Sequence, residues 1–153
     1  MFMEVKSLFN KAVYDEMMER INHLSTDSPR QWGKMSAAQM LAHCRQAFKV
    51  PLSEIPIPRM FIGRLLGWMV KSKLYGPKPY ARNLPTSPDF IIKDQRDFDR
   101  EKSELVNLVT QFHQEGPDKV GNYPHPFFGT FSKEQWGKSM WKHLDHHLRQ
   151  FGV

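Results

Sequence analysis

Histidines are the residues of this chain whose type and spacing could do chemistry. His143 and His147 stand four residues apart in a segment with helical periodicity, which places two imidazoles one above the other on one face. At this spacing two histidines can bind one metal ion. On a helical wheel of about 100° per residue, His147 lies about 20° and His143 about 60° from the centre of the apolar face, whereas His146 lies about 120° away. The pattern predicts His143 and His147, and not His146, as primary ligands.

A third ligand has to come from another helix. His43 lies in the middle of a predicted helix, at the edge of an apolar stripe and on the side of Met40 and Ala47. His23 lies off the apolar stripe of its own helix. His113 falls in a last helical turn, where the helix dipole favours a cation. We therefore expect His43 to complete the site.

The composition is that of a globular domain with no sign of a nucleic-acid or membrane protein. The 153 residues, 40% of them hydrophobic, suffice for one core, and the net charge of +6 comes from basic residues scattered over every segment. The longest apolar stretch, residues 60–70, is shorter than the roughly 20 residues that span a bilayer. The start lacks the pattern of a secretory signal. The single cysteine, Cys44, cannot form an internal disulfide, which suits a reducing compartment, and we expect it to be buried. We expect a cytoplasmic protein.

Helices have to position the histidines, because apolar residues recur at three- and four-residue steps. Ser36 with Gln39 and Ser132 with Gln135 read as capping boxes at two helix starts, and Gly116 with the proline after it reads as a helix end. The predicted helices cover residues 7–24, 37–50, 59–74, 93–115 and 133–150. The sequence predicts an all-α fold: one domain over residues 1–153, a four-helix bundle with an additional short helix and Pro-rich loops between helices 2 and 3.

The additional helix, residues 59–74, is basic and amphipathic. Such a helix could bind a membrane surface, but helices of this kind more often pack on their own protein and leave a basic face in solvent. We expect packing, and no membrane partner.

Two stretches of sequence resemble a known family. They are Met35-Ser36-Ala37-Ala38-Gln39-Met40-Leu41-Ala42-His43 and His143-Leu144-Asp145-His146-His147-Leu148-Arg149-Gln150. They resemble the DinB-like superfamily of four-helix metal proteins, which carries a histidine in the second helix and His-x-x-His-His-x-x-Gln in the last. The stretch His125-Pro126-Phe127-Phe128-Gly129 resembles an uncharacterised branch of that superfamily, known as a domain of unknown function. The resemblance implies ligands at His43, His143 and His147. It also implies low-molecular-weight thiols as cofactors, since members include thiol-dependent S-transferases and isomerases.

Three neutral imidazoles would leave a divalent ion at least one open position, as in catalytic sites. Zinc or nickel suits these nitrogen ligands, and iron, cobalt or manganese can occupy the same set. A thiol at the open position would lose its proton and become a nucleophile, which suits a metal-dependent thiol S-transferase. A metal-dependent hydrolase, or a noncatalytic metal-stabilised or small-molecule-binding module, stays open as the alternative. An open cavity beside the ion would favour an enzyme, and a sealed site would favour the noncatalytic module.

Three further polar residues are candidates for supporting ligands or binding substrate. Gln150 lies one turn beyond His147, His146 lies beside it, and His125 precedes the last helix between two prolines. A helix-end glutamine in solvent and a histidine merely tolerated in a rigid turn are the competing interpretations. We expect a small-molecule substrate and no nucleic acid as partners, and leave a homodimer open.

Overall fold

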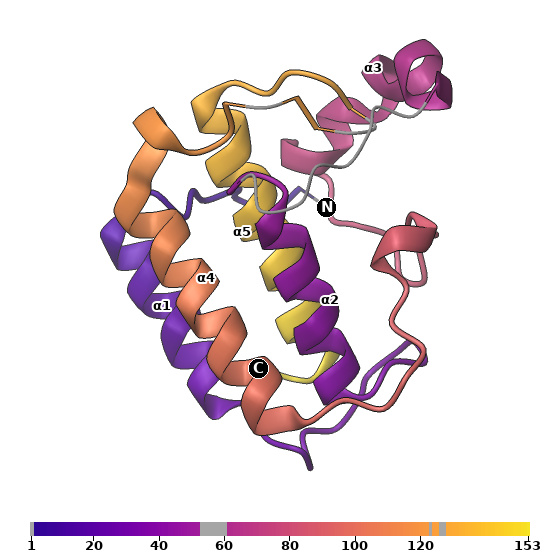
Figure 1. Cartoon of the computed structure of the whole chain (residues 1–153), viewed down its shortest axis with the longest axis vertical. Coiled ribbons are helices and arrows are strands. Elements are labelled where there is room, and N and C mark those ends of the chain that lie inside the picture. Colours follow the sequence, from indigo (N-terminus) through magenta and orange to yellow (C-terminus); the bar gives the residue numbers. More distant parts are fainter. Residues whose placement is uncertain (1, 53–60, 123, 126–127) are drawn as a thin grey trace.

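The computed structural model describes residues 2–52, 61–122, 124–125 and 128–153, with the backbone alone at residues 62–66. Its elements are α1 (Lys11–His23), α2 (Ala37–Lys49), α3 (Phe61–Tyr75), the 3-10 helix η1 (Pro88–Phe90), α4 (Phe98–Lys119) and α5 (Lys133–Gln150). Helices α1, α2, α4 and α5 pack against one another, and α3 lies at one end of them against α5 (Figure 1). The described residues contain helices and no strand, which confirms the all-α prediction.

The two helices that carry the histidine cluster begin where the sequence predicts. The Ser36 hydroxyl accepts the Gln39 N–H at the start of α2, and the Ser132 hydroxyl accepts the Gln135 N–H at the start of α5. In both boxes the glutamine side chain accepts the N–H of the capping serine in return. Each box satisfies backbone donors that a helix start leaves open, so both starts are specified locally.

The other helix boundaries differ by a few residues from the prediction. Helix α1 begins after Asn10, whose side chain accepts two backbone N–H groups, and α4 begins after Asp97, whose side chain accepts the Arg100 N–H. The chain therefore becomes helical later than at residues 7 and 93, because these short polar side chains cap it there. Gly116 breaks α4 with φ of 66°, as predicted, although one further turn follows.

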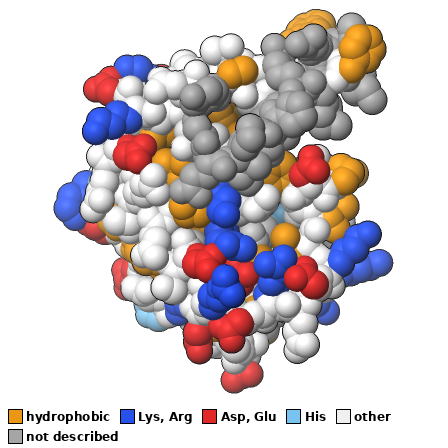
Figure 2. Space-filling model, viewed as in Figure 1, with side chains coloured by type: hydrophobic (Ala, Val, Ile, Leu, Met, Phe, Trp, Pro, Cys, Tyr) orange, Lys and Arg blue, Asp and Glu red, His pale blue; other side chains and the backbone are white. Residues whose placement is uncertain are grey.

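Apolar packing and buried ion pairs hold the helices in register. Cys44 is fully buried in the core, as predicted. Arg45 on α2 pairs with Glu101 on α4 at 2.9 Å, and Arg20 on α1 pairs with Asp145 on α5 at 2.8 Å. Figure 2 shows acidic and basic side chains intermingled on the face that α2 and α4 present. Both carboxylates are buried, and each has a second arginine partner, Arg96 for Glu101 and Arg149 for Asp145, so their charges are compensated inside the protein.

Helix α3 packs on α5, as expected, but not along its whole apolar face. Phe61 and Trp68 are each 74% exposed and Met69 is 58% exposed, so the expectation that the apolar face packs on the protein is wrong at these positions. Hydrophobic side chains are visible at the tip of this helix in Figure 2. The predicted start of the helix at Arg59 and Met60 lies outside the described residues. Among the described residues, no helix is long and apolar enough to cross a bilayer.

Candidate metal centre

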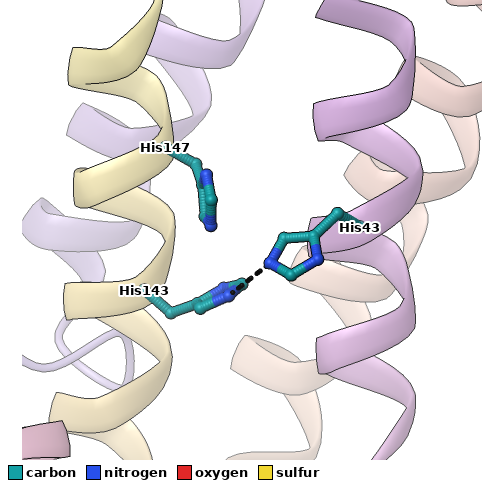
Figure 3. Close-up of side chains that lie close together, drawn as sticks. All are labelled: His43, His143 and His147. Atoms are coloured by element: carbon teal, nitrogen blue, oxygen red, sulfur yellow. Dashed lines mark hydrogen bonds between the residues drawn. The ribbon is translucent and has the colours of Figure 1, made fainter. Parts of the chain in front are cut away.

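The structure brings together the three histidines that the sequence nominates. His43 extends from α2 toward His143 and His147, which lie one turn apart on α5 (Figure 3). One ring nitrogen from each residue lies within 4.8 Å of the others, and the Nε2 atoms of His43 and His143 are 3.1 Å apart. Two nitrogens bound tetrahedrally to zinc at 2.0–2.1 Å are separated by about 3.3 Å. Small ring rotations therefore suffice to bring all three nitrogens to one ion.

Hydrogen bonds orient two of the three rings. The His43 Nδ1–H donates to the carbonyl oxygen of Phe90 at 2.9 Å, which leaves the Nε2 lone pair facing the cluster. The His147 Nδ1–H donates to the Gln150 side-chain oxygen at 2.9 Å, and the Gln150 amide donates in turn to the Trp32 carbonyl at 2.9 Å. The second bond fixes which end of the Gln150 amide faces His147. A partner on the second ring nitrogen is the usual arrangement for metal-binding histidines.

His143 completes the cluster in a different way. Its Nε2–H donates to Nε2 of His43, while its buried Nδ1 has no hydrogen-bond partner among the described residues. Burial lowers the pKa of His43, lowers that of His147 to about 3, and holds that of His143 well below its ordinary value. Neutral imidazole is the form that binds metal, so burial keeps the rings ready at neutral pH.

His146 lies outside the cluster, whereas Gln150 hydrogen-bonds one of the clustered histidines. The His146 ring lies 5.4 Å from Trp32 and 5.5 Å from Tyr80, centre to centre. Gln150 is buried with both ends of its amide bonded, so the solvent interpretation of this residue is wrong.

His125 lies before α5 and contacts residues that follow it in the chain. Its backbone pairs with Gly129, its Nδ1 accepts the Phe128 N–H at 3.2 Å, and its ring stacks on Phe131 at 5.6 Å. Because Nδ1 is an acceptor, the proton of the neutral ring is on Nε2. Burial lowers the pKa of His125 to about 4, so the ring stays neutral at physiological pH. His125 also forms part of the cavity wall.

A half-enclosed cavity of about 650 Å³ adjoins the histidines. His43, His143 and His147 form one part of its wall, and His125, His146 and Gln150 contribute to the rest. Its volume lies in the range of small-molecule sites. The site is therefore open beside the three nitrogens, which is the arrangement that favours an enzyme over a sealed structural centre.

Several residues that support or surround the histidines were not predicted from the sequence. Phe90 supports His43 through its backbone carbonyl, and a carbonyl has no side-chain signature. Trp32 and Tyr80 come from loops whose course periodicity does not reveal. Lys142 is buried on α5 and donates to the carbonyls of Lys73 and Gly76, tying α5 to the end of α3. The apolar periodicity of α5 gave no indication of that burial.

Comparison with known proteins yields a family and no named function. A family model described as a protein of unknown function (DUF1569) matches residues 4–152. No curated protein matches the chain, and no solved structure matches it. The matched range includes α2 and α5 with all three clustered histidines. The chain belongs to the DUF1569 family.

Proposed function

We propose that this protein binds one divalent metal ion through His43, His143 and His147 and is a metal-dependent enzyme acting on a small molecule. The observation that carries the proposal is the convergence of three buried imidazoles on the wall of an open cavity. The hydrogen bonds that orient His43 and His147 support it, because they prepare the Nε2 lone pairs in advance. Zinc and nickel are the ions that this donor set suits best.

Transfer to a thiol is the reaction we favour. A divalent ion lowers the pKa of a thiol bound at its open position, so the sulfur is a nucleophile without a separate base. No aspartate or glutamate is among the described residues that line the cavity, whereas many metal-dependent hydrolases use such a carboxylate as general base. In the transfer, sulfur bonds to an electrophilic carbon, the thiol proton passes to solvent, and the leaving group keeps the electron pair of the broken bond.

The resemblance to DinB-like proteins supports the same reaction, since that superfamily includes thiol-dependent S-transferases. We propose membership of that superfamily on the histidine spacing and the four-helix arrangement. The alternatives are a metal-dependent hydrolase and a noncatalytic metal-stabilised or small-molecule-binding module.

Metal analysis of protein purified without a histidine tag tests the ion. The wild-type protein should hold about one divalent ion per chain after saturation and buffer exchange, and His147→Ala should lose most of it. The control His23→Ala changes an exposed histidine on α1 and should keep the full content. Equal metal content in wild type and His147→Ala would contradict the proposed site.

Cobalt substitution tests the thiol. Glutathione, cysteine or a sugar-linked thiol added to the cobalt form should produce a sulfur-to-metal charge-transfer band in the near ultraviolet, stronger at higher pH because binding releases a proton. The band should be absent from His43→Ala. If no thiol changes the spectrum at millimolar concentration, the transferase is wrong and the hydrolase and the noncatalytic module remain.

A further inference from the structure

The cavity beside the histidines is lined largely by apolar side chains. Trp32, Tyr80 and Phe128 come from three different loops, and Leu74 and Met140 come from α3 and α5. Walls of this kind bind the apolar body of a ligand, because each methylene removed from water favours the bound state. The apolar wall says that the ligand has such a body and says nothing of its charge.

The fixed charge of the described residues that line the cavity has one sign. Among the described residues that line it, Lys34 carries a permanent charge, and no aspartate or glutamate is present. Arg82 adds a second cation nearby, with its guanidinium 4.6 Å from the centre of the Trp32 ring. Lys34 and Arg82 are both exposed, so an incoming ligand can reach them.

The three-histidine cluster adds to this imbalance once it holds an ion. Imidazole ligands are neutral, so the full double positive charge of a divalent ion would stay uncompensated by the protein. The half-enclosed apolar surroundings screen such a charge less than water does. An anionic donor atom at the open position is the group that balances it, and a cationic group is disfavoured there.

We propose that the ligand of this cavity is an amphiphilic anion, with an apolar body against the Trp32 and Tyr80 side and one negatively charged donor group at the ion. The inference rests on the proposed metal site and narrows its substrate class. A carboxylate and a thiolate share this chemistry, since each offers the ion one negative donor atom.

A matched set of eight-carbon ligands tests the charge, with calorimetry on the zinc-loaded protein. Octanoate should bind at least about tenfold more tightly than octan-1-ol, and octylammonium should not compete with it. Hexanoate should bind on the order of tenfold more weakly than octanoate, because two methylenes fewer are buried. A parallel titration with hexane-1-thiol separates the two donors: tighter binding than hexanoate identifies a thiolate site, and weaker binding identifies a carboxylate site.

Variants locate the binding. Ala47→Phe introduces a ring into the cavity one helical turn from His43, and should abolish octanoate binding while zinc content is retained. Lys34→Glu should weaken octanoate several-fold. Lys119→Glu makes the same change of net charge at an exposed residue of α4 outside the cavity lining, and should leave the affinity unchanged.

The outcomes separate this inference from the metal site on which it rests. Zinc-loaded protein that binds octan-1-ol or octylammonium as tightly as octanoate overturns the inference and leaves the metal site intact. If Ala47→Phe does not weaken octanoate binding to the zinc-loaded protein, the inference is overturned as well. Protein that binds no zinc contradicts the metal site and the inference together.

Discussion

At the scale of single residues, the cluster depends on which ring nitrogen carries each proton. His43 and His147 obtain the same tautomer from different partners, a backbone carbonyl and a side-chain amide. The Gln150 amide in turn donates to the Trp32 carbonyl. The orientation of His147 therefore depends on a chain of two hydrogen bonds, from His147 to Gln150 and from Gln150 to Trp32. Such partners raise ligand basicity and reduce the entropy lost on binding.

Removal of the Gln150 acceptor should weaken metal binding without removing a ligand. We expect Gln150→Leu to lose roughly 10- to 100-fold in zinc affinity, measured by competition with a chromophoric chelator. Gln150→Glu keeps an oxygen that accepts the His147 Nδ1–H and should recover most of the affinity, even if the lost bond to Trp32 lowers stability.

His146→Ala removes a ring outside the cluster and should bind zinc nearly as well as wild type. A loss in His146→Ala equal to that in His143→Ala would overturn the assignment of ligands.

His125 should make the stability of the protein depend on pH. Burial lowers its pKa to about 4 in the folded protein, against about 6.5 in the unfolded chain. Between these values the unfolded chain binds more protons, so the stabilisation is complete above pH 6.5 and is lost as the pH falls toward 4. From pH 8 to 5 the loss is about 2 kcal/mol for this one imidazole.

Urea unfolding of the metal-free protein at several pH values measures that loss. His125→Phe lacks the titrating group, while the other buried histidines contribute to both proteins alike. The variant should therefore lose about 2 kcal/mol less than wild type over the same interval. Identical pH dependence in the two proteins would show that His125 titrates normally.

At the scale of elements, loops hold the ligand-bearing helices in position. The segment between α1 and α2 returns to the end of α5, where the Gln31 N–H donates to the Gln150 carbonyl at 2.8 Å. Gly33 has φ of 82°, and a Cβ there would lie 2.4 Å from the Gln150 side-chain nitrogen. This glycine is required both for the backbone conformation and for the close approach of the Gln150 amide.

Two glycines with positive φ, Gly33 and Gly116, distinguish the effect of backbone conformation from the effect of contact with Gln150. Gly33→Ala and Gly116→Ala should each destabilise the protein by about 1–3 kcal/mol, because alanine disfavours backbone conformations with positive φ. A Cβ at Gly116 meets nothing within 4 Å, so only Gly33→Ala should displace Gln150 and also weaken zinc binding. Stability from urea unfolding and affinity from chelator competition distinguish the two. Equal zinc affinities would show that Gln150 does not position His147.

At the scale of the whole molecule, an ion in the cluster would cross-link α2 to α5. His43 and His143 are 100 residues apart in the chain, and the same two helices are also held through packing with α4. An ion bound only by the folded protein stabilises it by mass action. The protein should therefore fold without metal and become more stable with it.

Thermal unfolding with zinc and with chelator measures this coupling. At free zinc about one hundred times the Kd, the gain is ~2.7 kcal/mol, which corresponds to roughly 5–10 °C in Tm for a chain of this size. His43→Ala should show no zinc-dependent change in Tm, and His23→Ala should respond as wild type does. A Tm that rises equally in His43→Ala would place the ion elsewhere.

The sequence alone determined the features that depend on local spacing. Capping boxes predicted the starts of α2 and α5, periodicity predicted five helices, and the wheel predicted which faces of α2 and α5 turn inward. It also nominated the three histidines that the structure brings together, because helical geometry fixes the direction of side chains one turn apart.

Only the tertiary structure decided what surrounds those histidines. The carbonyl of Phe90, the burial of Gln150 and the cavity with its Trp32 and Tyr80 wall arise where loops distant in sequence meet. The exposure of Trp68 likewise depends on where α3 lies relative to the bundle and not on its own periodicity. Local spacing determines the direction of a side chain within its helix, whereas its surroundings depend on long-range packing, which spacing along one helix does not encode.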